Sequence, residues 1–359
     1  MKKFLFLIII LSLMIISYAK PKNVIVIMGD GMGYNHVLLS ELLCQANNME
    51  IATKNFQVAS LVRNDTLDNV VTDSGAAATA FFCGEKTKLQ YVGMDKEQKS
   101  LDSLGKILKR EGYKVGLITN TRYYDATPAG IYAHAHRRDT EKITKDLVSS
   151  NFMDFFVAGG FEKLGVNPFT MKPKKDSELK KINENGYKVY GNNYELLFDS
   201  NQERFMAFVA PGDKNFENEL ITGELPFIDV VEKTVEKIKD DQPLFMFVEA
   251  GRIDDASHIN NTEAVKSELL MFQKIVNYLT KEFNPEETLF IIFADHETGG
   301  LSIFSSTVDG SDITIKWNHT DHTGTYVPFL TYGNSKDIFP KQMHLENVKD
   351  VLLKTLEVE

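Results

Sequence analysis

The chain alternates short apolar runs with longer segments of mixed polarity. Residues 23–28 read Asn-Val-Ile-Val-Ile-Met, a run without a charged side chain that predicts a strand buried on both faces. Runs of the same kind cover 114–119, 244–248 and 288–294, and a late one covers 327–332. We expect each of these runs to form a strand of one central sheet.

Helical segments separate the apolar runs. A glycine-rich turn at 29–33 leads into a helix predicted to end near Asn47, a second helix ends near Gly112, and residues 345–356 predict a C-terminal helix. Strands that alternate with helices are typical of folds with a parallel sheet. We therefore expect an α/β fold, a three-layer sandwich around a largely parallel central sheet, in a single domain over residues 20–359.

The segment from about 160 to 225 does not follow this pattern. It contains the polar run Lys172-Pro-Lys-Lys-Asp176 and several asparagines, and its apolar positions show weaker periodicity. We interpret it as an elaboration between core units, or a cap over the site, rather than as a second domain.

The N-terminus has the three parts of a secretory signal. Lys2 and Lys3 are followed by an apolar run over 4–16 that only Ser12 interrupts, and then by the small-x-small sequence 17–19. The run is short for a membrane span, which needs about 20 residues. We expect residues 1–19 to be a cleaved signal peptide and the protein to be periplasmic or secreted; an uncleaved membrane anchor is the less favoured alternative.

The charge and cysteine content narrow the classes of function. The formal net charge is −10, and loss of Lys2 and Lys3 with the signal would lower it to −12. Since no basic stripe offsets this charge, a nucleic-acid partner is not expected, and clustered carboxylates point instead to bound cations.

The two cysteines, Cys44 and Cys83, cannot form a disulfide framework, and the sequence does not show whether they are bonded to each other.

The stretch 71–80 is the strongest local signal for chemistry. It reads Val-Thr-Asp-Ser-Gly-Ala-Ala-Ala-Thr-Ala, so that Ser74 stands at the start of a helix of very small residues. Free N–H groups at a helix N-terminus favour anions. Taken alone, the simpler interpretation of Ser74 is an N-cap on a buried helix. A serine nucleophile needs a base or a metal ion to activate it. The other motifs decide whether Ser74 is an N-cap or a nucleophile.

Three acids follow buried strands at their carboxyl ends. They are Asp30, Glu249 and Asp295, which end the runs at 23–28, 244–248 and 288–294. In open α/β sheets this edge is where ligands bind. One acid after a strand is ordinary, but three of them predict a shared site.

Histidines in these segments add candidate metal ligands. Asp254 and His258 are four residues apart and would share one helix face, His296 follows an acid directly, and His322 has His319 as a nearby competitor. Imidazole mixed with carboxylate suits Zn²⁺, whereas an all-oxygen set suits Mg²⁺. The remaining candidates are oxygen ligands: Asp30, Asp125, Thr127, Glu249 and Asp295.

Together these motifs resemble the alkaline phosphatase family. They occur in the family's order from Val24 to about Gly333, and the match is weakest over 160–225. The chain is also short for the family. The motifs are Gly29-Asp-Gly-Met-Gly33, Thr72-Asp-Ser-Gly-Ala-Ala-Ala-Thr79, Asp125-Ala-Thr-Pro-Ala129, Tyr132-Ala-His134, Val248-Glu249, Asp254 with His258, Ala294-Asp-His296 and His322-Thr-Gly324.

The resemblance implies two Zn²⁺ ions and one Mg²⁺ ion. One Zn²⁺ would be held by Asp254, His258 and His322, where the His-Thr-Gly motif selects His322 over His319. The second would be held by Asp30, Asp295 and His296. Asp30 would also reach toward Mg²⁺, whose other protein ligands would be Thr127 and Glu249, with Asp125 bonding through the ion's waters.

The resemblance also implies a nucleophile and a phosphate clamp. Ser74 would be the nucleophile and would form a phosphoserine. Arg138 would bind the phosphate, because the family's spacing of thirteen residues from Asp125 selects it over the adjacent Arg137. In familiar members a lysine or histidine follows the metal-binding aspartate of the helix, whereas this chain has Asp255, which predicts weaker binding of phosphate.

The implied activity is that of an exported, metal-dependent phosphomonoesterase. Its substrates would be small phosphate monoesters, its product inorganic phosphate, and a homodimer is the expected assembly. Two alternatives stay open: a phosphodiesterase, sulfatase or phosphomutase with a similar bimetal core, and a non-catalytic exported protein that binds metal or phosphate. Arg138 with Thr127 and Glu249 favours monoesters, and the intact Ser74 argues against a binding protein.

Overall fold

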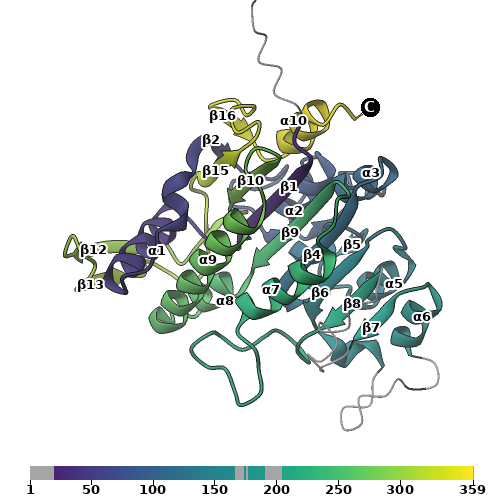
Figure 1. The fold of residues 1–359 in the computed structure, drawn as a ribbon, viewed down its shortest axis with the longest axis horizontal. Helices are drawn as coiled ribbons and strands as arrows, with labels where there is room; N and C mark the ends of the chain where they lie inside the picture. The colour runs from purple at the N-terminus through teal and green to yellow at the C-terminus, as the bar shows by residue number, and fades with distance from the viewer. Residues whose placement is uncertain (1–19, 166–173, 175–176, 191–203, 359) are drawn as a thin grey trace, which may run out of the picture.

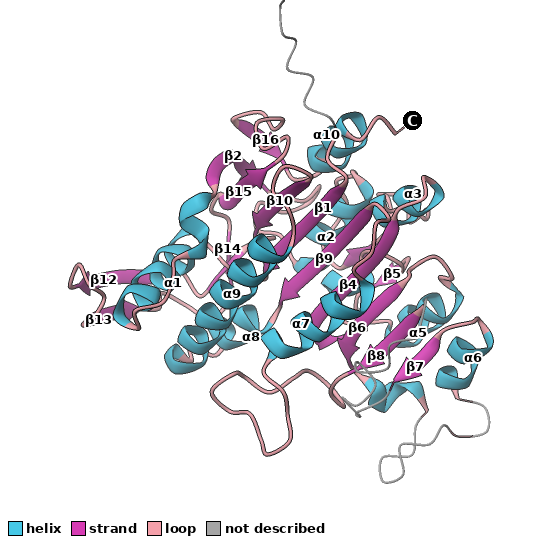
Figure 2. Ribbon diagram, viewed as in Figure 1, coloured by secondary structure: helices cyan, strands magenta, loops and turns pink. Residues whose placement is uncertain are grey.

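A ten-stranded sheet with helices on both faces forms the body of the protein (Figures 1 and 2). This computed structural model describes residues 20–165, 174, 177–190 and 204–358, so the expected signal peptide lies outside the described residues. The strand order is β16-β2-β15-β10-β1-β9-β4-β6-β8-β7. The predicted three-layer α/β sandwich is confirmed.

The predicted apolar runs form the centre of the sheet. β1 (Asn23–Gly29) lies between β9 (Leu244–Ala250) and β10 (Thr288–Phe293) and is parallel to both, and β4 (Lys114–Arg122) is parallel to β9. Every residue of β1, β9 and β10 is buried. These strands carry no alternating polar positions because helices cover both of their faces.

The two flanks of the sheet differ in strand direction. On one side β6 (Phe155–Gly159), β8 (Phe205–Phe208) and β7 (Lys188–Tyr190) continue the parallel order. On the other side β15 (Val327–Gly333) is antiparallel to β10 and to β2 (Gln57–Arg63), and β16 (Gln342–His344) is parallel to β2. Part of the 160–225 segment thus extends the sheet edge through β7 and β8.

Helices pack in two groups against the sheet. In Figure 1, α1 (Tyr34–Ala46), α7 (Phe227–Ile238) and α9 (Thr262–Glu282) lie in front of the strands, and α8 (Arg252–His258) contacts α9. On the opposite face α2 (Ser74–Cys83) packs against the sheet, where the Phe81 ring stacks on Phe293 at 4.5 Å. Packed near α2 are α3 (Leu104–Arg110), α4 (Ala126–Ala129) and α10 (Asn347–Thr355).

The remaining elements are short. The helices α5 (Thr140–Ser149) and α6 (Glu178–Glu184) contact each other near the β7 edge. Three two-stranded ribbons pair β3 (Tyr91–Val92) with β5 (Ala135–His136), β11 (Glu297–Thr298) with β14 (His322–Thr323), and β12 (Ser302–Ser306) with β13 (Ile313–Lys316). Single 3₁₀ turns cover Ala52–Asn55 and Phe161–Leu164. Across the described ranges no helix has both the length and the apolar character of a membrane span.

Both cysteines are free thiols inside the protein. Cys44 and Cys83 are buried and not bridged to each other. Burial raises the pKa of Cys44 to about 11 and the pKa of Cys83 to about 12. Because the thiolate is the reactive form, these side chains fill space in the core rather than carry chemistry.

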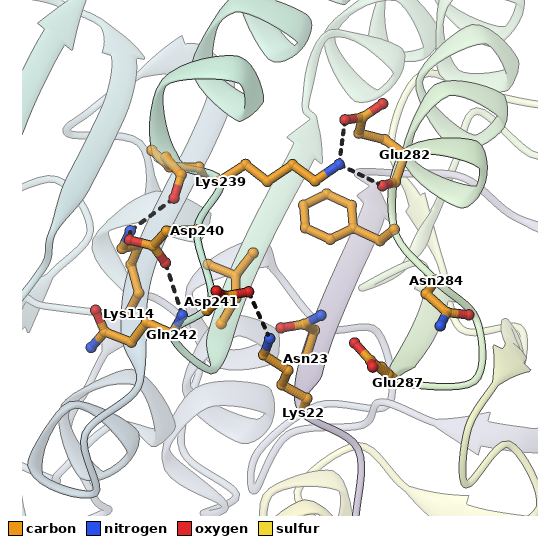
Figure 3. A pocket seen from close by; sticks show the side chains of 13 residues that line it. Lys22, Asn23, Lys114, Lys239, Asp240, Asp241, Gln242, Glu282, Asn284 and Glu287 are labelled. Atoms are coloured by element: carbon orange, nitrogen blue, oxygen red, sulfur yellow. Dashed lines mark hydrogen bonds and ion pairs between the residues drawn. The ribbon is translucent and has the colours of Figure 1, made fainter. Parts of the chain in front are cut away.

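A shallow pocket of about 230 Å³ opens at the amino ends of β1, β4 and β9 (Figure 3). Its lysines are paired with neighbouring acids: Lys22 with Asp241 at 3.8 Å, Lys114 with Asp240, and Lys239 with Glu282 at 2.5 Å. The acids that follow the strands lie at the opposite, carboxyl edge of the sheet. The candidate site is therefore at that edge and not in this pocket.

Candidate active site

Three buried carboxylates meet at the carboxyl ends of neighbouring strands. Asp30 follows β1, Glu249 lies in β9 opposite Met28, and Asp295 follows β10; they are 6%, 1% and 1% exposed. Burial, and then the charges of Asp295 and other acids, raise the pKa of Asp30 well above its usual value. Burial likewise raises the pKa of Glu249 to about 8. Such a cluster is costly unless a cation compensates it.

Gly31 allows this edge to close tightly. Its φ of +69° lies in the left-handed region, and a Cβ there would stand 2.8 Å from both Asp254 Oδ1 and Thr298 Oγ1. Its N–H donates to Asp295 Oδ1 at 3.2 Å. The turn after β1 therefore brings α8 and β11 next to the strand ends, which explains the glycines in the 29–33 motif.

Asp30, Asp295 and His296 form a first triad. His296 Nε2 lies 3.1 Å from Asp295 Oδ2 and 3.5 Å from Asp30 Oδ1. Both oxygens are buried and accept no hydrogen bond from any residue that the structure describes. Three ligand atoms that lie close together, two of them carboxylate oxygens without a hydrogen-bond partner, are the donor set of a Zn²⁺ site.

Asp254, His258 and His322 form a second triad. His258 Nε2 lies 3.2 Å from Asp254 Oδ2 and 3.1 Å from His322 Nε2, which is 3.8 Å from Asp254 Oδ1. Burial lowers the pKa of His322 to about 4, which favours the neutral ring that a metal requires. The rings of His322 and His296 stack at 3.5 Å, so the two triads adjoin. His319, the competitor in the sequence, is exposed and its Nδ1 accepts from the Asp321 backbone.

A third group of oxygens lies beside Asp30. Thr127 Oγ1 donates to Asp30 Oδ2 at 3.3 Å, and Asp125 caps α4 through a bond from Ala126 N at 2.7 Å. Glu249 is held by the hydroxyl of Thr119, and by that of Thr121 at 3.3 Å, in β4. The predicted oxygen ligands are thus close to one another, and the two threonines that orient Glu249 were not predicted.

Thr298 links the two triads and was also not predicted. Its hydroxyl donates to Asp254 Oδ1 and lies 3.1 Å from His296 Nδ1. Because the hydroxyl hydrogen is used by Asp254, the imidazole donates Nδ1–H and its Nε2 is left as the metal ligand. No motif around Thr298 in the sequence predicts its contacts with Asp254 and His296.

Ser74 faces the first triad rather than capping α2. The N-cap is Asp73, whose carboxylate accepts from Ala76 N at 3.3 Å, and Ser74 is the first residue of the helix. The Ser74 Oγ lies 3.2 Å from His296 Nε2 and the side chain is 4% exposed. The N-cap interpretation of Ser74 is therefore wrong. Its hydroxyl is bonded to His296 Nε2 and therefore lies between the N-terminus of a helix and a metal-type triad.

Of the two adjacent arginines, Arg137 points into the candidate site and Arg138 points to solvent. Arg137 donates to Asp73 Oδ2 at 2.9 Å and to Asp125 Oδ1 at 3.4 Å, whereas Arg138 is exposed and its backbone N–H bonds to His136 Nδ1. The structure thus brings Arg137, and not the predicted Arg138, to the acids beside Ser74. Residue spacing cannot tell which of two adjacent side chains in the turn after β5 points toward the site.

Asp255, the departure noted in the sequence, is neutralised by a neighbour. Its carboxylate pairs with Arg252, one turn earlier in α8. Burial raises the pKa of Asp255 to about 6, against the opposing charge of Arg252. The ion pair offsets the negative charge that was expected to repel phosphate.

Comparisons with known proteins agree with this geometry. The family model described as alkaline phosphatase matches residues 21–357. The chain is 29% identical over 319 residues to the repressible alkaline phosphatase of Saccharomyces cerevisiae and 27% identical over 301 residues to alkaline phosphatase 4 of Bacillus subtilis. Each match covers 79% of this chain but only 56% and 63% of the two relatives. The chain thus spans about three fifths of their length.

Solved structures show the same fold. The alkaline phosphatase from the Antarctic bacterium TAB5 superimposes with a TM-score of 0.81 at 24% identity, over 95% of this chain and 99% of that one. The Thermus thermophilus alkaline phosphatase gives a TM-score of 0.82 at 19% identity, over 95% of this chain and 92% of that one. A histidine-to-aspartate variant of the TAB5 enzyme has Mg bound in its M3 site.

Proposed function

The chain belongs to the alkaline phosphatase family, and from this premise we propose that it hydrolyses phosphate monoesters through a phosphoserine at Ser74. The observation that carries the proposal is the position of the Ser74 hydroxyl, 3.2 Å from His296 at the junction of the two triads. A serine used only for helix capping would direct this oxygen to the backbone of α2, where Asp73 already serves as the cap.

The proposal includes two Zn²⁺ ions and one Mg²⁺ ion. The triads supply mixed imidazole and carboxylate ligands for the zinc ions, and Asp30, Thr127 and Glu249 supply oxygens for magnesium, with Asp125 nearby. Metal ions at such sites neutralise phosphate charge and lower the pKa of coordinated oxygens. The unpartnered oxygens of Asp30 and Asp295 are the feature of this chain that supports them.

Arg137 is proposed to bind the phosphate dianion. Neighbouring Asp125 and Asp73 outweigh burial and raise the pKa of its guanidinium, so the group stays charged. A planar guanidinium can bind two phosphate oxygens at once. The carboxylates of Asp73 and Asp125 each bind one nitrogen of the Arg137 guanidinium and so fix its orientation. The charge of Asp30 helps to raise the pKa of Arg137, and the charge of Arg137 lowers the pKa of His296; both effects support a position near the first triad.

The proposed chemistry transfers the phosphoryl group twice. The Ser74 oxygen attacks phosphorus, the bond to the leaving alcohol breaks, and the alcohol leaves with a proton while phosphoserine forms. Water then attacks the same phosphorus, which releases inorganic phosphate and restores the serine hydroxyl. The helix N-terminus at Ser74 and the Arg137 guanidinium stabilise the negative charge of the phosphoryl oxygens in both steps.

Export and self-association complete the proposal. Export is supported by the leader-like sequence of residues 1–19, and a homodimer by the resemblance to family members that often form one. The N-terminal sequence of the exported protein and its mass in solution are the measurements that check these two points.

The reaction class can be tested with three chromogenic esters. The protein loaded with Zn²⁺ and Mg²⁺ is assayed on a phosphate monoester, a phosphate diester and a sulfate monoester that share one leaving group. We expect the kcat/KM for the monoester to exceed the others by at least about 10³-fold, which corresponds to about 4 kcal/mol. Preference for the diester or the sulfate would contradict the proposal, and phosphate binding without any turnover would support a binding protein.

A further inference from the structure

An alternating series of aspartates and arginines extends from the candidate site through Asp213, in the loop after β8, to α8. Each member contacts the next, and four acids alternate with three bases. In spatial order they are Asp73, Arg137, Asp125, Arg122, Asp213, Arg252 and Asp255. The sequence identified Asp125 and Asp255 as candidate site residues and left Arg137 as the alternative to Arg138. It did not identify Arg122, Asp213 or Arg252.

Three close contacts join the residues in the middle of the series. Arg122 donates through one guanidinium nitrogen to Asp213 Oδ2 at 2.7 Å and lies with the other 3.1 Å from Asp125 Oδ2. Its backbone N–H also donates to Asp213 Oδ1 at 2.8 Å. Asp213 therefore binds both the main chain and the side chain of Arg122, which fixes the guanidinium next to Asp125.

Asp125 divides its two oxygens between two arginines. Oδ1 accepts from Ala126 N and from Arg137, whereas Oδ2 faces Arg122. If Arg122 were absent, Oδ2 would be open to a second N–H of Arg137. A bidentate ion pair with both oxygens of Asp125 is the strongest arrangement available to the Arg137 guanidinium. It would direct the N–H groups of Arg137 away from a bound phosphate.

We propose that Arg122, held by Asp213, is a positioning residue that keeps Arg137 directed at phosphate by occupying the second oxygen of Asp125. This inference rests on the proposed function of the site. It gives the loop that contains Asp213 an indirect part in substrate binding, through Arg122 and Asp125.

The competing interpretation is that the Arg122–Asp213 pair only fastens the loop to β4. A fastening role predicts a loss of stability with unchanged affinity for phosphate. A simple charge effect is also distinguishable: replacing Asp213 by Asn removes a negative charge and would strengthen phosphate binding, whereas loss of positioning would weaken it.

The test compares Arg122→Met, Arg122→Lys and Asp213→Asn with the wild type. Arg110→Met is the matched control, since Arg110 pairs with Asp102 on the exposed face of α3. Binding of inorganic phosphate to the metal-loaded proteins is measured by calorimetry, together with KM, kcat and the melting temperature. Calorimetry does not depend on turnover, so the positioning role and the proposed activity are tested separately.

We expect Arg122→Met to weaken phosphate binding about 10-fold and to raise KM similarly, with a smaller change in kcat. Arg122→Lys should recover most of the affinity, Asp213→Asn should lose several-fold, and Arg110→Met should match the wild type. Unchanged phosphate affinity in Arg122→Met, or tighter binding in Asp213→Asn, would overturn the inference. If Arg122→Met fails to fold, Arg122→Lys and Asp213→Asn decide between the outcomes. Wild-type protein that binds no phosphate would overturn this inference and the proposed function together.

Discussion

Each imidazole of the two triads uses its Nδ1 atom in a hydrogen bond to a threonine and directs its Nε2 atom toward the other ligands. The Nδ1 atoms of His258, His322 and His296 bond to Thr320 O at 2.6 Å, Thr72 O at 2.9 Å and Thr298 Oγ1 at 3.1 Å. In all three rings Nε2 is therefore left to face the other ligands. Such outer contacts fix the tautomer of a metal-binding histidine and its orientation.

Thr298 is the residue whose loss should affect both triads at once. Thr298→Val keeps the shape but removes the hydroxyl shared by Asp254 and His296, so we expect 10- to 100-fold weaker binding of zinc. Titration against a competing chelator measures this directly, independently of activity. Thr298→Ser should restore affinity, and Thr288→Val, a buried threonine at the amino end of β10, is the control. Wild-type zinc affinity in Thr298→Val would refute the role.

The choice between Arg137 and Arg138 gives a second prediction at this scale. Arg137→Ala removes the guanidinium held by Asp73 and Asp125, so phosphate binding should weaken and kcat/KM should fall by at least about 10²-fold. Arg138→Ala changes an exposed side chain and should leave both within about two-fold. A larger loss in Arg138→Ala than in Arg137→Ala would show that the spacing argument was right.

At the scale of elements, strand ends and short two-stranded ribbons carry the site residues, and the loop after β8 packs beside them. Asp30, Glu249 and Asp295 are placed by β1, β9 and β10, and β11 with β14 brings His322 to Thr298 in register. The loop after β8 is anchored by buried polar contacts, since Lys214 Nζ donates to Glu224 at 2.9 Å and to Leu225 O at 2.8 Å.

Loss of the Lys214 anchor should destabilise the protein markedly. The Lys214 side chain is fully buried, and Lys214→Met would leave Glu224, only 10% exposed, with hydrogen bonds from Asn215 but without its cationic partner. Removal of one member of a buried pair costs about 3 kcal/mol, whereas Lys180→Met, from an exposed pair with Glu184, should cost below about 1 kcal/mol. Denaturant unfolding of both variants compares the two. Equal losses would mean that the loop is not held through Lys214.

The sequence predicted those elements whose signal is local. The apolar runs at 23–28, 244–248 and 288–294 identified the central strands because burial on both faces removes polar alternation. The antiparallel direction of β15 could not be derived, since an apolar run carries no direction. Likewise Asp213 and Arg122 lie 91 positions apart, and no short-range pattern joins them.

At the scale of the whole molecule, four acids lie together where cations would bind. Asp30, Glu249, Asp254 and Asp295 lie together although the chain already carries a formal charge of −10. Their mutual repulsion, together with burial, opposes folding in the absence of cations. Metal binding and stability should therefore be linked in this protein.

Chelation should lower the melting temperature along with the activity. A cation present at 100 times its Kd stabilises the native state by about 2.7 kcal/mol for each site, and removal of all cations forfeits this. Differential scanning calorimetry before chelation, after it, and after Zn²⁺ and Mg²⁺ are restored measures the effect. A melting temperature that chelation leaves unchanged would mean that the carboxylates are not held together by cations.

The covalent step at Ser74 is the central claim, and trapping phosphate on the protein tests it most directly. The metal-loaded enzyme is mixed with a phosphate monoester, quenched in acid and digested, and the phosphorylated residue is located by mass spectrometry. We predict one phosphoserine, at Ser74, that is absent in Ser74→Ala, whose turnover should fall by at least about 10³-fold. Phosphate on another residue, or near-wild-type turnover in Ser74→Ala, would contradict the account.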